Sequence, residues 1–483
     1  MKKYFWLVIL LFIISRFCFL ANYPHFYDSP EYLRESISPS FFNSLSSSHE
    51  VVHPVWLFLT QIFQGITSQP TSWELSLISA FFGLICMVAF YFLAKRLFDE
   101  KTAVFSLIPL IFFSHLWLIQ TNILHESLDL GLFLLSLLFF DFFLQKRRFY
   151  WWGLTVLFLS LSILDFVGIL LWSVAFLGLA ILRSKKNVWR KNIVWGFLTI
   201  FLSLILSLIS LFLLLLLTKT IEPISRIRII FLGFGATGIF SGWGLIDILR
   251  MLRNNLYILF YGYSIAAILG LIFTSVYLFQ KKRWSLLIFL FSFFIPFLIT
   301  GKFWHFGPFG RLAVLIAYPL ALFLALMPWR KIYWILIAII FLTFCPTFWV
   351  YQKTPIPQIQ ASLIDEIETK EKDILVLSDY QRPQLSYDNA LYVNSKEEIQ
   401  KMVEEKINEK LLTGGRVFIS QQAIDFPYWQ YDGQQIHIIS RGDKNKAQLK
   451  EFLKDKEKKL VAEDKNYPLL NLYQLQKEVL SFK

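Results

Sequence analysis

The chain has 483 residues, of which 56% are hydrophobic and 18% aromatic. This composition excludes an ordinary soluble domain and indicates a chain that folds in lipid. The formal net charge of +13 does not indicate nucleic-acid binding, because basic residues of membrane proteins collect in cytoplasmic loops and no soluble segment carries a basic stripe with interleaved aromatics. The cysteines all fall in apolar runs and predict neither a disulfide framework nor a cysteine metal site. They are Cys18, Cys86 and Cys345.

A membrane-spanning helix needs about 20 predominantly apolar residues, and about eleven segments of the first 351 residues approach this length. The first segment lacks a clear small-x-small cleavage site, so we interpret it as a retained span rather than a signal peptide. The segment 149–182 is long for one helix and short for two, and basic residues flank both ends, so we expect it to turn near Asp165. The predicted spans lie near residues 4–21, 73–94, 102–119, 127–144, 149–164, 167–182, 192–217, 256–279, 284–300, 311–328 and 332–351.

Basic clusters between these spans predict the orientation of the chain. They all fall on one side of the membrane if the N-terminus is cytoplasmic. An odd number of spans then places the C-terminal segment outside the cytoplasm, together with the loops 22–70 and 218–255. We therefore predict a multi-pass protein of the plasma membrane. The basic clusters are Lys2/Lys3, Lys95/Arg96/Lys101, Lys146–Arg148, Arg183–Lys191, Lys281–Arg283 and Arg330/Lys331.

The composition changes sharply after residue 351, where Lys, Glu and Gln become frequent. Short β-type runs at 374–377, 390–393, 416–420 and 436–440 alternate with charged, helix-like stretches at 395–412 and 444–458. This alternation predicts a small α/β domain. The expected fold is therefore an all-α polytopic membrane bundle, residues 1–351, followed by an extracytoplasmic α/β domain, residues 352–483.

Two carboxylates open the first predicted outer loop. Asp28 and Glu31 stand three residues apart, and they share one face if Pro30 begins a short helix. A carboxylate at the membrane surface is partly desolvated, which favours its use as a proton acceptor. The alternative is an acidic helix N-terminus that Asp28 caps.

Two histidines also fall on the predicted outer side. His53 precedes Pro54 at the entry to an amphipathic stretch, where it either contacts a phosphate or caps the interface. His125 and Glu126 nearly match the zinc-protease pattern His-Glu-x-x-His, but residue 129 is Asp, so the second ligand is missing and we reject a protease. Ionisable groups at membrane depth are costly and indicate function by default. A structural hydrogen bond is the alternative role for His125.

Several arginines depart from the positive-inside trend. Arginines on the outer face can pair with an anionic lipid phosphate, and ordinary interfacial snorkelling is the alternative. The glycine pattern 233–238 in the second outer loop has the letters of a dinucleotide fingerprint, but no βαβ unit surrounds it, so we reject that function. The arginines are Arg226, Arg228, Arg250 and Arg253 in the second loop and Arg311 at the mouth of the tenth span.

The order of these motifs resembles that of the GT-C superfamily of membrane glycosyltransferases, particularly the branch of aminoarabinose transferases and protein O-mannosyltransferases. An apolar first span is followed by an Asp-x-x-Glu-Tyr loop at 28–32, His-Pro-Val at 53–55, a span that ends with 91–98, and an outer turn that carries Glu126. The resemblance covers residues 1–180. It continues less closely to about residue 351 through Gly310-Arg311-Leu312 and Tyr318-Pro319.

The resemblance implies an enzyme that moves a sugar from a polyprenyl-phosphate donor to a hydroxyl of a lipid, glycan or protein on the extracytoplasmic face. Asp28 matches the family's catalytic base, Glu126 its second acidic motif, and His53 the residue that holds the carrier phosphate. The chain has Asp-Ser where many relatives have Asp-Glu, Pro-Val where they have Pro-Pro, and Glu126 where they commonly have Asp. These departures mean that the resemblance does not name the sugar.

The chemistry assigns the predicted residues to two groups. The donor's leaving group is already a stable phosphate anion, so the protein must mainly deprotonate the acceptor and neutralise the phosphate. Asp28 and Glu126 are the predicted catalytic residues, and they would hold a divalent metal ion if the enzyme uses one; no cofactor is required by the sequence. The predicted substrate-binding residues are Glu31, His53, His125, Arg226, Arg228 and Arg311.

Three other functions fit a chain of this kind. A transporter or flippase for a lipid-linked substrate commonly has internal repeats, and none is visible in this sequence. A polymerase or ligase that transfers a whole oligosaccharide would add a long block rather than one sugar. A non-enzymatic membrane anchor for the C-terminal domain would leave the biological activity in the isolated tail.

Overall fold

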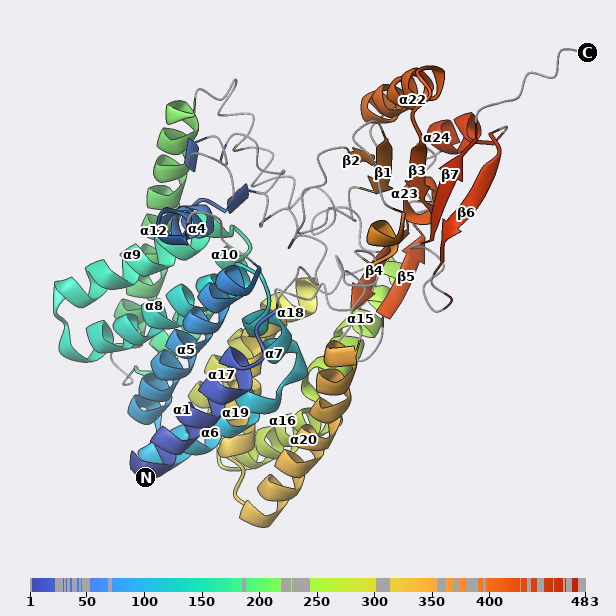
Figure 1. Cartoon of the computed structure of the whole chain (residues 1–483). Helices are drawn as coiled ribbons and strands as arrows, with labels where there is room; N and C mark the ends of the chain where they lie inside the picture. Colours follow the sequence, from blue (N-terminus) through green and yellow to red (C-terminus); the bar gives the residue numbers. More distant parts are fainter. Residues whose placement is uncertain are drawn as a thin grey trace, which may run out of the picture. The chain divides into compact units, whose positions relative to one another are not determined.

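The chain forms two compact units, the first mainly helical and the second built on a small sheet (Figure 1). Unit 1 comprises Met1–Trp349 with Asp432–Gln434, and unit 2 comprises Val350–Tyr431 with Gln435–Lys483. This computed structural model describes residues 2–21, 29, 32, 35, 36, 41, 42, 45, 53–67, 72–184, 188–218, 227, 244–300, 313–353, 362–367, 373–378, 390–393, 397–425, 427–431, 436–440, 447–454, 456–463, 465 and 471–476.

Four helices of the described residues are long and apolar enough to cross a membrane, and the number rises to six if each of two bent pairs is one span. The four are α5 (Ser72–Leu97), α8 (Glu126–Lys146), α12 (Trp189–Leu217) and α20 (Arg330–Lys353). Most of α8 is buried inside unit 1, 83% of its most apolar stretch, whereas α12 is only 22% buried and leaves most of its apolar surface exposed. The predicted count of eleven spans stays a prediction.

The two bent pairs fall where the sequence analysis predicts spans, at 102–119 and 256–279, and each predicted span is a pair of helices rather than one continuous helix. In the first pair α6 (Glu100–Phe112) and α7 (Ser114–Thr121) meet at 73°, with extended backbone at Phe113 between them. In the second pair, α15 (Leu245–Tyr263) and α16 (Ile265–Gln280) join at Ser264, whose φ of 78° lies in the left-handed region. Hydropathy does not report such bends, because both arms of each pair remain apolar.

The break between α6 and α7 is stabilised by an arginine of α1 (Lys2–Phe17). Where α6 ends, the carbonyls of its last turn lose their helical partners. The guanidinium of the fully buried Arg16 donates to the carbonyl oxygens of Leu110 and Ile111, at 3.0 and 2.9 Å, and to the side chain of Gln120 on α7 at 3.0 Å. Arg16 therefore connects α1 to both arms of the bent pair.

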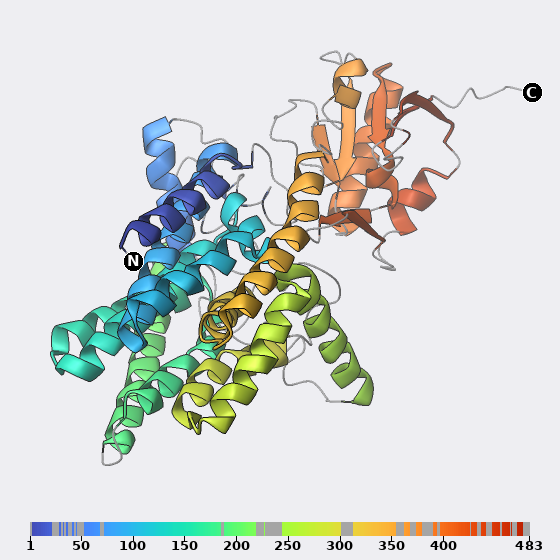
Figure 2. The same cartoon turned by 90° about the horizontal axis from the view of Figure 1, so that it is seen from below.

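The predicted turn near Asp165 is confirmed, because α9 (Phe149–Asp165) ends at that residue and a short bend separates it from α10 (Ile169–Trp172) and α11 (Val174–Leu182). Gly168 belongs to this bend. A side chain does not fit there without a shift of Phe166, because an added Cβ would lie 2.4 Å from the Phe166 ring. Figure 2 shows the helices of unit 1 lying side by side from below. The remaining helices of unit 1 are α4 (Pro54–Thr67), α17 (Trp284–Ser292), α18 (Phe294–Thr300) and α19 (Ala317–Ala325).

The C-terminal end of α8 carries an ion-pair cluster. Asp141 is fully buried and binds Nε of Arg96 at 2.7 Å and Nε of Arg183 at 2.5 Å. The three residues belong to α5, α8 and the end of α11, so the cluster joins these helices. The sequence analysis predicts that this end faces the cytoplasm, and the orientation stays a prediction.

Unit 2 contains a five-stranded sheet in the order β2-β1-β3-β7-β6 and a separate β4-β5 hairpin. Strand β1 (Ile374–Ser378) pairs in parallel with β2 (Ala390–Val393) and β3 (Val417–Ser420), while β7 (Leu472–Leu475) pairs antiparallel with β3 and β6 (Lys458–Ala462). The hairpin consists of β4 (Pro427–Tyr431) and β5 (Ile436–Ser440).

Alternate residues of β1 enter two apolar cores on the two faces of the sheet. Val376 packs with residues of α22 (Glu397–Leu412), α23 (Gln421–Asp425) and α24 (Ala447–Phe452), whereas Leu375 and Leu377 pack with Leu363 and Ile364. The predicted α/β character of the tail is therefore confirmed. The sequence analysis missed β4, β6 and β7, and its helix-like stretch 444–458 was wrong at its end, where Lys458 begins β6.

Candidate functional site

Three helix ends of unit 1 bring five ionisable side chains together at the end of α8 that is opposite the Asp141 cluster. Fifteen residues of helix separate Glu126 from Asp141, which is about 22 Å at 1.5 Å per residue. Each of the five residues is at most 4% exposed. We call this group the buried polar site. Its members are His53 before α4, His125, Glu126 and Asp129 at the start of α8, and Asp165 at the end of α9.

The two imidazole rings stack face to face, with centroids 3.7 Å apart and planes 26° from parallel. His53 and His125 are separated by 72 positions in the sequence, and α4 and α8 supply them independently. Tyr32 of the first loop is fully buried and lies beside the stack, with its ring nearly perpendicular to both imidazoles and a centroid distance of 5.6 Å to each. The stack is therefore enclosed by an aromatic side chain from a third segment.

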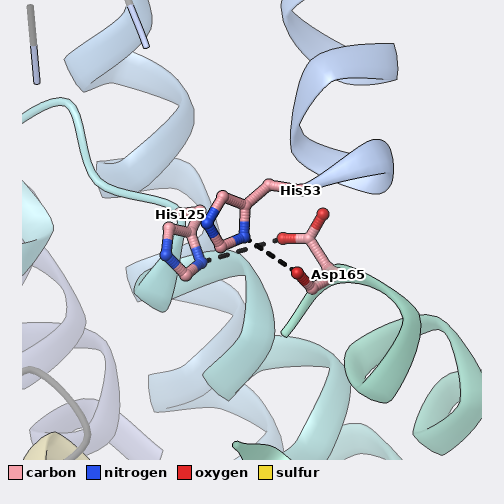
Figure 3. A group of neighbouring side chains, drawn as sticks. All are labelled: His53, His125 and Asp165. Carbon is pink, nitrogen blue, oxygen red and sulfur yellow. Dashed lines mark hydrogen bonds and ion pairs between the residues drawn. The ribbon is translucent and has the colours of Figure 1, made fainter. Parts of the chain in front are cut away.

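Asp165 fastens the start of α4 to the end of α9. Its backbone oxygen lies 2.8 Å from Nδ1 of His53 (Figure 3). Its carboxylate oxygen Oδ1 accepts a hydrogen bond from the Trp56 amide at 2.8 Å. Pro54 begins α4, as is common for the first helical position, and the carboxylate satisfies an amide that has no partner inside the helix. Asp165 thus has a structural role as a cap supplied by another helix.

On α8, Nδ1 of His125 lies 2.7 Å from Oδ2 of Asp129, one helical turn away. The same nitrogen is 3.9 Å from Oδ2 of Asp165, and Nε2 of His125 is 3.6 Å from a carboxylate oxygen of Glu126. Acidic residues in the first turn of a helix interact favourably with its dipole. Asp165 lies at the C-terminal end of α9, where the helix dipole disfavours a negative charge. The dipole therefore does not account for an acidic residue at this position.

The structure brings together three of the residues that the sequence analysis selected, His53, His125 and Glu126. It adds two that were missed as site residues, Asp129 and Asp165. The sequence feature that could have selected them is a carboxylate at the end of an apolar helix, where an ionisable group is costly. Among the other selected residues, Arg253 belongs to α15. The ones that lie outside the described residues are Asp28, Glu31, Arg226, Arg228 and Arg311.

The donor set of this site is compatible with a metal ion. One ligand atom from each of His53, His125 and Asp165 can be chosen so that all three atoms lie within 4.8 Å of one another. Imidazole nitrogen and carboxylate oxygen are ligands that zinc and related divalent ions use. The predicted metal residues Asp28 and Glu126 are not this set.

Comparisons with known proteins point to one superfamily. A family model described as dolichyl-phosphate-mannose-protein mannosyltransferase matches residues 51–211, a range that contains all five members of the buried polar site. The search of curated proteins found no match. The chain is similar in structure to ArnT from Cupriavidus metallidurans bound to undecaprenyl phosphate, with a TM-score of 0.59 and 12% identity over 98% of this chain and 97% of that chain.

Two solved structures of the Archaeoglobus fulgidus oligosaccharyltransferase are also similar. The complex with Zn and sulfate has a TM-score of 0.50 and 14% identity over 90% of this chain and 73% of that chain. The form tethered to an acceptor peptide has the same TM-score and identity over 91% and 74%. At these identities the structures establish the fold alone. The family model and the shared fold together confirm that this chain resembles the GT-C superfamily of membrane glycosyltransferases.

Proposed function

We propose that the protein is a membrane glycosyltransferase that moves a sugar from a polyprenyl-phosphate donor to an acceptor hydroxyl on the extracytoplasmic face. The observation that carries the proposal is the gathering of His53, His125 and Glu126 in one buried site, opposite the basic end of α8. If these residues only capped their own helices, their side chains would not need to meet from separate segments. The family model and the ArnT structure with undecaprenyl phosphate support a lipid-linked donor.

The first loop reaches this site. Tyr32 contacts both imidazoles, and the buried hydroxyl of Ser29 donates to the carbonyl oxygen of Ile123 at 2.9 Å, two residues before His125. Ser29 directly follows Asp28 in the sequence. These two contacts support the proposal that Asp28 acts at the buried polar site.

The proposed reaction is a direct displacement. The acceptor oxygen forms a bond to the anomeric carbon, the bond between that carbon and the phosphate oxygen breaks, and polyprenyl phosphate leaves with the electron pair. The acceptor proton passes to the Asp28 carboxylate, and the anomeric centre is inverted. His53 and His125 would bind the phosphate, with Arg226, Arg228 and Arg311 as further proposed contacts, while Glu126 and Glu31 would orient the sugar or acceptor.

Release of undecaprenyl phosphate tests this proposal whichever sugar is transferred, because it is the common product of every undecaprenyl-phosphate donor. The purified full-length protein is reconstituted in vesicles with a panel of hexosyl and pentosyl donors and a membrane extract as acceptor source. The wild-type protein should release the carrier from at least one donor. Replacement of Asp28 by Asn should lower turnover by about 10²–10⁴-fold, the usual contribution of a positioned base.

A matched control is Asp99→Asn, because Asp99 caps α6 at the basic end of the bundle and Asn caps helices equally well. Its turnover should equal that of the wild type. Undiminished turnover of Asp28→Asn would remove Asp28 from the role of base. Failure to turn over any donor with any acceptor fraction would refute the glycosyltransferase proposal itself.

A further inference from the structure

Five exposed basic side chains gather at the end of unit 1 where α8 turns into α9 and where α12 begins. Among the described residues none of the five forms an ion pair with an acidic side chain. We call this group the basic patch. Its members are Lys146, Arg147 and Arg148 in the turn between α8 and α9, and Arg190 and Lys191 in the first turn of α12.

Direct contacts hold the two parts of the basic patch side by side. Arg147 ends α8 in the left-handed conformation, with a φ of 54°, and its guanidinium donates a hydrogen bond to the side-chain oxygen of Asn192 on α12. The rings of Trp152 and Trp195 lie 5.3 Å apart, and Nε1 of Trp152 donates to the hydroxyl of Thr199 at 3.0 Å. The turn is therefore packed on the first turns of α12, and its charges lie next to those of α12.

The positive charge of the basic patch has no balancing acid on the same elements. Residues 142–164 and 188–218 contain neither Asp nor Glu. Asp141 precedes the patch on α8, but its carboxylate already binds Arg96 and Arg183. Like charges that lie close together repel one another unless an anion lies between them. The basic patch therefore favours an anionic partner.

Apolar surface continues directly from the basic patch. Phe149, Tyr150 and Trp189 are exposed beside the charges, and the guanidinium of Arg190 lies 5.4 Å from the ring centre of Trp189. Aromatic side chains of this kind are enriched where a membrane meets water. The exposed apolar side chains that follow on α12 are Val194, Phe197 and Phe201. The basic end and the apolar side of α12 together match a molecule with a charged head and apolar chains.

We infer that the basic patch binds the headgroup of an anionic phospholipid, whose acyl chains lie along the exposed side of α12. A soluble anion would use the charges alone, whereas a phospholipid uses both the charges and the adjoining apolar surface. Arginine binds phosphate oxygens through a planar fork of donors, and Arg148 and Arg190 have no other hydrogen bond among the described residues. The basic patch is at the end of α8 opposite the buried polar site, so this inference does not rest on the proposed function.

Native mass spectrometry of the full-length protein in a neutral detergent tests this inference. The protein is titrated with phosphatidylglycerol or with phosphatidylcholine of the same acyl chains, and the dissociation constant of the first bound lipid is compared. The wild type should bind phosphatidylglycerol more tightly. One basic side chain near an anionic lipid contributes a factor of about five in affinity, so Arg148→Gln with Arg190→Gln should weaken phosphatidylglycerol binding by about 25-fold and leave phosphatidylcholine binding unchanged. Arg148→Gln alone should weaken it by about fivefold.

The matched control is Lys401→Gln with Lys406→Gln, which removes the same net charge from exposed positions of α22 in unit 2. It should bind both lipids as the wild type does, and all variants should elute as folded protein in size-exclusion chromatography. Equal affinity of the wild type for the two lipids would overturn the inference and leave the basic residues as a signal for chain orientation alone. An equal loss in the control and in the patch variants would also overturn it, because attraction would then follow net charge rather than this surface.

Discussion

Substitution of Arg16 tests whether this side chain stabilises the bend between α6 and α7. The side chain is fully buried and donates four hydrogen bonds, two of them to the carbonyl oxygens that the bend after α6 leaves without helical partners. Arg16→Met keeps most of the side-chain length but removes every donor. An unsatisfied buried carbonyl costs about 1–3 kcal/mol, so the loss of two should lower the free energy of unfolding by about 2–6 kcal/mol. Arg16→Lys retains the charge and some of the donors and should cost roughly half as much.

Thermal unfolding in detergent micelles measures this effect. The unfolding entropy of a chain of this size is about 1 kcal/mol/K, so the midpoint of Arg16→Met should fall by about 2–6 °C. The control is Arg190→Met, since Arg190 is exposed at the start of α12 and should change the midpoint by about 1 °C or less. A midpoint for Arg16→Met equal to that of the control would refute the claim that this arginine stabilises the bend.

Two further predictions concern packing inside unit 1. Asp141→Asn leaves the two arginines of the basic cluster without a charged partner; because both can reach water, we expect a loss of about 1–3 kcal/mol in unfolding free energy, measured by the same thermal assay, and an unchanged midpoint would contradict the cluster's role. Gly178→Ala should lower the midpoint, because an added Cβ would meet the Phe289 backbone at 3.0 Å and so separate α11 from α17. Gly153→Ala is its control, since nothing lies within 4 Å of that position, and equal midpoints for the two variants would show that the close approach is unimportant.

The parts of the fold that could be predicted depend on local patterns. Apolar length predicted the long helices, and a change of composition predicted the α/β tail, because burial in lipid and burial in a sheet leave different periods in the sequence. Local patterns also selected His53, His125 and Glu126, since ionisable groups in apolar surroundings are unusual. The bends at Phe113 and Ser264 could not be predicted in this way, because hydropathy is the same on both sides of each bend.

The sequence by itself therefore determined a membrane bundle with a small α/β unit, and a short set of polar residues that are candidates for a functional site. Only the tertiary structure decided which of them meet. Asp165 contacts His53 across 112 residues and Trp56 across 109, and it was visible in the sequence merely as the point where a long apolar segment turns. Side-chain periodicity reports which face of an element is buried, but it contains no information on which distant element covers that face. The buried polar site is a product of such pairings, so its composition appeared only once the helix ends were brought together.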